Sequence, residues 1–229
     1  MYHKLEMNKN TFEEKYFKEE YGHIADFSQK TTKKNYNWFK GLFHAINSQT
    51  NILEGKGKTA LEFGCATGAA SKVLYDYGYK LTAADISSYA IKHAKKLYSE
   101  INFIKHDVQK AFQNEKKYDL VLALDVIEHL ENPQKAINNM YNLVKANGLV
   151  ICSTPNDYAR AKNLPTHINV KKPQEWKKLF RDAGFKKTEI CQMTFFPFFY
   201  RFHWRLNFAL PIGVDIIFIC SPVFIFARK

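Results

Sequence analysis

The chain has 229 residues, of which 46% are hydrophobic and 24% are charged. At roughly 150 residues per domain this length predicts one large domain, and the composition excludes a disordered chain, a collagen-like fibre and a coiled coil. The net charge of +12 would suit nucleic acid or an anionic membrane, but Lys is scattered through the chain, so a solvated basic surface explains it as well.

The predicted elements alternate between strands and helices after a helical N-terminal cap over residues 1–50. The sequence predicts strands near 59–63, 81–84, 101–104, 118–124 and 149–152, then 186–192. It predicts helices over 69–77 and 87–99, from Pro133 to before Gly148, and from Pro173 to Gly184. This order predicts an α/β fold with a mostly parallel sheet and helices on both faces.

The cysteines and the chain ends predict a reduced, cytoplasmic protein. The four Cys residues form no closely spaced pair, so neither a zinc site nor a disulfide framework is expected. The N-terminus has no apolar core of the kind that a signal peptide needs. The uncharged run 216–227 falls short of the roughly 20 residues that span a bilayer.

A glycine turn follows the first predicted strand, and acids follow the strands around it. Gly64 and Gly68 allow a sharp turn and close approach of a ligand, although the dinucleotide fingerprint is incomplete. Asp85 ends the second strand and suits a ribose diol, while Asp107 after the third suits an exocyclic amine. Acids at successive strand ends indicate one ligand site.

These motifs together resemble class I S-adenosylmethionine-dependent methyltransferases. The resemblance rests on Glu62-x-Gly64-x-Ala66-x-Gly68, on Asp85, on Asp107 and on the strand that begins at Tyr118. It covers roughly residues 55–192, with Ala66 where the family often has glycine. It implies a Rossmann-like fold of seven strands, of which the last, 222–228, is antiparallel. We expect one domain over 1–229, with a core at 51–192 and an aromatic insertion plus terminal strand at 193–229.

The resemblance implies S-adenosyl-L-methionine as cofactor and S-adenosyl-L-homocysteine as its product. The glycine loop would pass under the methionine part, with Glu62 orienting it, and Asp85 would hold the ribose. Asp107 would accept from the adenine amine. The implied cofactor-binding residues are Glu62, Gly64, Cys65, Ala66, Thr67, Gly68, Asp85, Ile86, Asp107, Val108 and Leu124.

A second constellation, Asp125-x-x-Glu128-His129, follows the fourth strand, and His167 comes later in the chain. It resembles ubiquinone-biosynthesis O-methyltransferases and small-RNA 2′-O-methyltransferases, although the fuller histidine cluster of the RNA group is missing. We assign Asp125, Glu128, His129 and His167 as catalytic residues, with the histidines as candidate bases. No residue is assigned as a metal ligand; a divalent metal remains an open alternative to the base.

The segment Phe195–Phe208 has eight aromatic residues and two Arg. It could form a lid over an apolar acceptor, a membrane contact, a dimer interface or part of the core. Stacking on single-stranded bases would need spaced aromatics, so burial is the preferred expectation.

The sequence therefore predicts a methyltransferase acting on a hydroxyl, and less readily on an amine, of a small, glycan- or lipid-linked acceptor. Contact with a membrane periphery and a homodimer are compatible with the sequence, and nucleic acid is disfavoured. The alternatives are an RNA 2′-O-methyltransferase and a non-catalytic cofactor-binding subunit.

Overall fold

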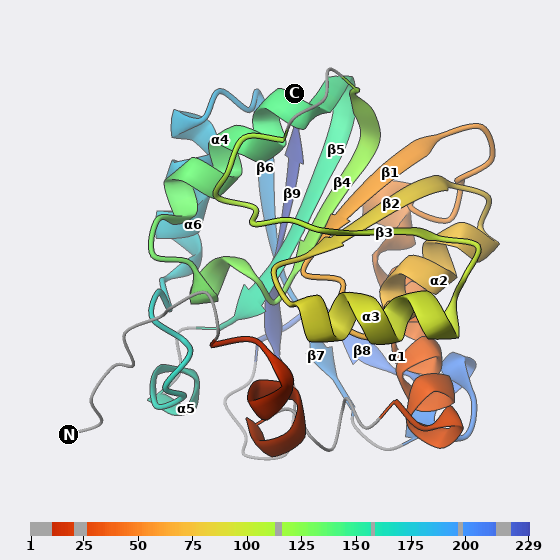
Figure 1. Cartoon of the computed structure of the whole chain (residues 1–229). Helices are drawn as coiled ribbons and strands as arrows, with labels where there is room; N and C mark the ends of the chain where they lie inside the picture. Colours follow the sequence, from red (N-terminus) through yellow and green to blue (C-terminus); the bar gives the residue numbers. More distant parts are fainter. Residues whose placement is uncertain (1–10, 21–26, 113–115, 157–158, 197–198, 214–220) are drawn as a thin grey trace. The chain divides into compact units, whose positions relative to one another are not determined.

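The computed structural model describes residues 11–20, 27–112, 116–156, 159–196, 199–213 and 221–229 (Figure 1). Its described strands form a seven-stranded sheet in the order β3-β2-β1-β4-β5-β9-β6 and a separate two-stranded sheet of β7 and β8. The strands are β1 Thr59–Phe63, β2 Lys80–Asp85, β3 Asn102–Lys105, β4 Tyr118–Leu124, β5 Val144–Pro155, β6 Lys187–Gln192, β7 Thr194–Phe195, β8 Ala209–Leu210 and β9 Pro222–Arg228.

The described helices follow the predicted alternation. The α-helices are α1 Gln29–Thr50, α2 Ala69–Asp76, α3 Ser88–Leu97, α4 Pro133–Leu143, α5 Ala159–Lys162 and α6 Pro173–Asp182. The short helices are η1 Tyr16–Glu20, η2 Ile127–His129, η3 Phe199–Arg201 and η4 Trp204–Leu206. None of the helices in the described ranges is both long and apolar enough to cross a membrane.

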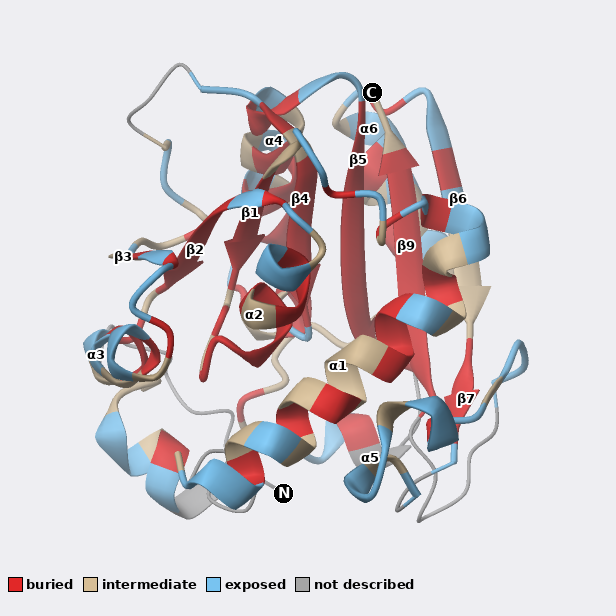
Figure 2. Ribbon diagram, turned by 90° about the vertical axis from the view of Figure 1, so that its right-hand side faces the viewer, coloured by how far each residue is buried: buried red, intermediate tan, exposed pale blue. Residues whose placement is uncertain are grey.

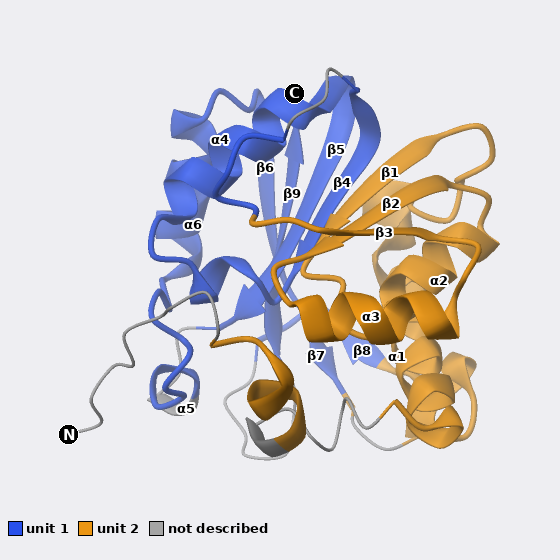
Figure 3. Cartoon of the chain, in the orientation of Figure 1, with its two compact units in different colours: residues 1–7, 108–195, 209–229 blue, residues 8–107, 196–208 orange. Residues whose placement is uncertain are grey.

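The chain folds as two compact units, which Figure 3 colours separately. The described residues of unit 1 fall within Val108–Phe195 and Ala209–Lys229, and those of unit 2 within Asn8–Asp107 and Phe196–Phe208. The expected organisation as one domain over 1–229 stays a prediction.

The most buried strands of unit 1 are mostly apolar in sequence: β4, β9 and residues 149–152 of β5. β4 and β5 are parallel, and β9 runs antiparallel to both β5 and β6, as the sequence predicts for the last strand. Figure 2 shows β4, β5 and β9 as predominantly buried ribbons. Strands covered on both faces need apolar residues at every position, which is why β4 could be read directly from its sequence.

Unit 2 holds the parallel strands β1, β2 and β3. Its helices begin at the polar residues that the sequence offers as caps: Ser28 Oγ accepts from the Thr31 amide, and Ser87 Oγ accepts from the Ala90 amide. The predicted helical cap over residues 1–50 forms η1 and α1 but is not helical at residues 11–13, 27 and 28; residues 1–10 and 21–26 lie outside the described range.

Candidate functional site

The glycine loop in unit 2 is held in backbone conformations that an L side chain seldom adopts. Gly64 and Gly68 have φ of 71° and 77°, and Ala66 has φ of 44°. A Cβ on Gly68 would lie 2.8 Å from Cζ of Phe103, so glycine is required there on two grounds. Ala66 tolerates a conformation that glycine would adopt without strain, and this explains the glycine that the family often has at that position.

Asp85 ties the glycine loop to the end of β2. One carboxylate oxygen accepts from the Ala66 amide at 2.9 Å, and the other accepts from the Ser87 amide at 2.8 Å. The side chain is buried, and burial raises the pKa of Asp85 while the backbone donors oppose that rise. Each oxygen retains a second lone pair, so the residue fits a ligand hydroxyl as well as the loop.

Glu62 lies beneath the same loop. Its buried carboxyl accepts from the Ser71 hydroxyl of α2, and burial raises its pKa to about 7. This bond joins β1 to α2 on the two sides of the loop, which fits the expected loop-orienting role.

Replacing Glu62 by Gln should flatten the pH dependence of stability. A pKa raised from 4.5 to about 7 gives stabilisation that is complete below about pH 4.5 and is lost as pH rises through 7. In the wild type the free energy of unfolding should therefore fall by about 3 kcal/mol between pH 4.5 and pH 7 because of this group. In Glu62→Gln this fall should be absent. Denaturant unfolding at several pH values measures it, with exposed Glu54→Gln as control. An unchanged pH dependence in Glu62→Gln would contradict the assignment.

The remaining cofactor-binding residues predicted from sequence divide between the two units. Cys65 and Thr67 are buried in the loop, whereas Ile86 and Asp107 are partly exposed; all four belong to unit 2. Val108 and Leu124 belong to unit 1 and are buried. Their roles toward the cofactor stay predictions.

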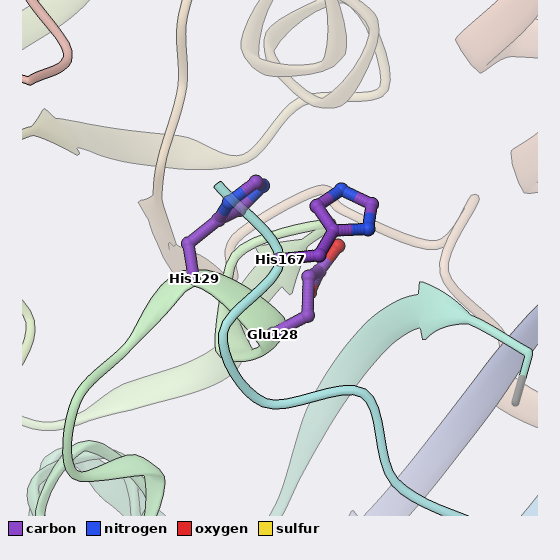
Figure 4. A group of neighbouring side chains, drawn as sticks. All are labelled: Glu128, His129 and His167. Carbon is purple, nitrogen blue, oxygen red and sulfur yellow. The ribbon is translucent and has the colours of Figure 1, made fainter. Parts of the chain in front are cut away.

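In unit 1 the structure gathers three of the four predicted catalytic residues. Ligand atoms of Glu128, His129 and His167 all lie within 4.8 Å of one another, and Figure 4 shows their side chains clustered. The two imidazole rings meet edge to face with centroids 4.8 Å apart. We call these three residues the Glu-His-His cluster.

Asp125 makes a different set of contacts. Its φ is 52°, its amide donates to the carbonyl and hydroxyl oxygens of Ser153, and the Ser153 hydroxyl donates back to its carboxylate at 2.8 Å. Asp125 therefore stabilises the turn between β4 and η2 and is not part of the Glu-His-His cluster.

The backbone selects one tautomer for each histidine of the cluster. Nδ1 of His129 lies 2.8 Å from the Thr166 carbonyl, and Nδ1 of His167 lies 3.0 Å from the Ala161 carbonyl. A carbonyl only accepts, so Nδ1 carries the proton and Nε2 the lone pair in both neutral rings. Burial and the neighbouring His167 lower the pKa of His129 to about 4, and burial also lowers the pKa of His167. Both rings are thus neutral near pH 7.

Glu128 is the most unusual residue of the cluster. It is 0% exposed, and within the described residues neither carboxyl oxygen has a partner at normal hydrogen-bond geometry, although the Thr154 hydroxyl lies near enough to lower its pKa. Burial, followed by the Asp125 charge, raises its pKa well above the usual range. An unsatisfied buried carboxyl costs stability, so Glu128 is a candidate for binding a cation or another ligand.

Asn169 is a structural residue of the site that sequence reasoning missed. Its amide donates to the Glu128 carbonyl at 2.8 Å, and its side chain donates to the Leu130 carbonyl. These bonds hold the His167 segment against η2. Its proximity in sequence to His167 was the available signal, but a single Asn does not reveal a partner such as Leu130, 39 residues away.

Comparison with known proteins agrees with this fold and these motifs. A family model described as a methyltransferase domain matches residues 38–190. Two relatives, both named ubiquinone biosynthesis O-methyltransferase, are from Rickettsia typhi (27% identical, covering 81% of this chain and 88% of the relative) and Rickettsia felis (25%, 81% and 89%). Magnesium protoporphyrin IX methyltransferase from Synechocystis PCC 6803, solved with bound S-adenosylhomocysteine, superposes with a TM-score of 0.61 at 17% identity and covers 93% of this chain and 97% of its own.

The fold and the motifs thus define an S-adenosylmethionine-dependent methyltransferase of the Rossmann-like class. By the match over residues 38–190, the chain belongs to the methyltransferase domain family.

Proposed function

We propose that this enzyme methylates a hydroxyl of a small acceptor with an apolar, lipid-like part, and that the Glu-His-His cluster serves the acceptor. The observation that carries the proposal is the buried, unpartnered carboxyl of Glu128 beside two neutral imidazoles. The names of the Rickettsia relatives support oxygen as the methylated atom and a lipid-like acceptor. A glycan-linked acceptor has no comparable support.

In this proposal the unit 2 residues bind the cofactor. The left-handed turn at Gly64–Gly68 leaves room for the methionine part, the Asp85 carboxylate accepts from the ribose hydroxyls, and Asp107 accepts from the adenine amine. S-adenosylmethionine supplies an activated methyl on a sulfonium, so the protein's main tasks are positioning and exclusion of water.

The acceptor hydroxyl must lose its proton, and the cluster offers two means. His129 could take the proton at Nε2, but a pKa of about 4 makes it a weak base. The cluster also fits a divalent cation, because one carboxylate and two imidazole nitrogens form a suitable donor set and Glu128 is otherwise unpaired. A cation held by Glu128, His129 and His167 would supply a Lewis acid that lowers the pKa of the acceptor hydroxyl. We favour the cation.

Removal of divalent metal tests this choice. Dialysis against EDTA should lower methyl transfer at least tenfold, and added Mg²⁺ or Mn²⁺ should restore it, because one Lewis acid supplies several kcal/mol. Calorimetry with Mn²⁺ should show binding that His167→Ala weakens and exposed His203→Ala leaves unchanged. Full activity in EDTA would assign the proton transfer to His129 acting as a base.

The acceptor class is tested with matched compounds. Transfer of a labelled methyl group should be faster to a phenol with an apolar tail than to the same phenol without one, and slowest to the corresponding aniline. Preference for an amine, or transfer to RNA alone, would contradict the proposal.

A further inference from the structure

The aromatic segment of unit 2 carries an exposed surface that contains none of the cluster residues. Phe199, Phe202 and Phe208 are exposed by 55%, 79% and 56%. Phe196 and Leu206 are also exposed, and we call these five residues the aromatic patch. The expectation that the segment is buried is therefore wrong for these residues, although it holds for Phe195 at its start.

Residues that alternate with the patch residues along the sequence pack against α1. Tyr200 packs against Trp38 with ring centroids 5.0 Å apart, and Trp204 stacks on His44 at 4.2 Å. The side chain of Asn207 donates to the Trp38 carbonyl at 3.0 Å. These contacts hold the segment on α1. Phe199 and Phe202 are therefore exposed on a segment whose Tyr200 and Trp204 side chains are packed.

Gly41 of α1 explains how closely the segment approaches the helix. A Cβ at this position would lie 2.4 Å from Cβ of Asn207 and 2.8 Å from the Trp204 carbonyl oxygen. The amide of Phe196 donates to the Phe208 carbonyl at 3.0 Å and closes the segment at its base. Tyr200 and Trp204 thus stabilise the loop, whereas the patch residues are exposed on its outer side.

The charged residues within the aromatic segment are of one sign. The sequence has no Asp or Glu between Thr194 and Val214, whereas Arg201 and Arg205 are both exposed. Lys40 of α1 and Arg205 lie 5.1 and 5.3 Å from the Trp204 ring, which is next to patch residues in the segment. Exposed aromatic rings beside cationic groups are the composition of a surface that enters the headgroup layer of an anionic membrane.

We propose that the aromatic patch docks the enzyme onto an anionic phospholipid bilayer, with Phe199 and Phe202 entering the interface and Arg201 and Arg205 meeting lipid phosphates. A second copy of the chain fits less well, because a symmetric contact would bring the same cations together. The reason for docking, which is to meet a lipid-like acceptor at the membrane, rests on the proposed function. The binding to the membrane itself requires no methyl transfer.

Vesicle sedimentation of the full chain tests the apolar contribution. The wild type should bind phosphatidylglycerol-containing vesicles, and Phe202→Ser should lower the partition coefficient about tenfold, as expected for one buried aromatic ring. Phe199→Ser/Phe202→Ser should lower it further. Tyr75→Ser, at an exposed aromatic residue of α2, is the matched control and should bind as the wild type does.

The charge contribution is tested in the same assay. Arg201→Gln/Arg205→Gln should weaken binding to anionic vesicles by about fivefold per residue and leave the weak binding to pure phosphatidylcholine unchanged. Lys95→Gln/Lys96→Gln, on exposed residues of α3, changes the net charge equally and should have a much smaller effect.

Three results would overturn the proposal. They are no binding of the wild type to anionic vesicles, equal loss in patch and control variants, or a patch variant that changes only the oligomeric state by light scattering. Transfer to an untailed, water-soluble acceptor should be unchanged in Phe199→Ser/Phe202→Ser. If the wild type binds anionic vesicles but transfers no methyl group to any of the tested acceptors, the proposed function is refuted and the membrane proposal stands.

Discussion

Asp85→Ala is expected to weaken binding of S-adenosylhomocysteine at least a hundredfold in isothermal titration calorimetry. The substitution removes an ionised acceptor for the ribose hydroxyls, and each hydrogen bond to a charged group contributes about 1.5–3 kcal/mol. It also releases the Ala66 and Ser87 amides, which Asp85 holds at 2.9 and 2.8 Å, so the loop loses its tie to β2.

Because the loop itself is affected, the experiment needs a test of folding. Unfolding curves should show that the variant is folded at the temperature of the titration. Asp182→Ala, which removes an exposed carboxylate paired with Lys178 on α6, is the charge-matched control and should bind the product as the wild type does. Affinity of folded Asp85→Ala within threefold of the wild type would remove Asp85 from the cofactor site.

Glu128→Gln is expected to lower methyl transfer about a thousandfold while the protein becomes more stable without metal. Burial raises the pKa of this carboxyl, so folding at neutral pH must protonate it, whereas an amide of the same shape needs no proton. The gain in unfolding free energy at neutral pH, measured in EDTA, should be about 1–3 kcal/mol. Gain of stability with loss of activity separates a functional carboxyl from a structural one.

The neighbouring Glu131→Gln controls for the change in charge, since Glu131 is exposed. It should leave both transfer and stability near wild type. Product binding should be retained in Glu128→Gln, because the predicted cofactor acids are other residues. Transfer at the wild-type rate in Glu128→Gln would refute the role of the Glu-His-His cluster, whatever happens to stability.

Local patterns were sufficient to predict the strands and the glycine loop. β1 and β4 have the predicted bounds, because a mostly apolar stretch bounded by polar residues or glycine fixes where a buried strand begins and ends. The start of β5 at Val144 instead of Leu149 was missed, since Lys145-Ala-Asn-Gly148 contains no apolar run; Val144 pairs with Tyr118, and the register then shifts to the Leu120–Leu149 pair.

The cluster was only partly predictable. Asp125, Glu128 and His129 are close in sequence and were predicted as one site, but Asp125 bonds to Ser153, which is 28 residues away. The carbonyls of Thr166 and Ala161 that set the histidine tautomers, and the Asn169 bonds that hold their segment, involve backbone atoms that every residue possesses. No residue pattern marks such partners.

The sequence by itself determined the class of protein, because the order of Glu62, the glycine loop, Asp85 and Asp107 along alternating strands carries the cofactor chemistry. The tertiary structure alone decided that Glu128 is buried without a partner, that His129 and His167 meet, and that Phe202 faces solvent while Trp204 packs on α1. Burial and contact depend on which distant segments come together. The composition of a segment records only what its side chains prefer, so the aromatic run pointed to burial when half of it is exposed.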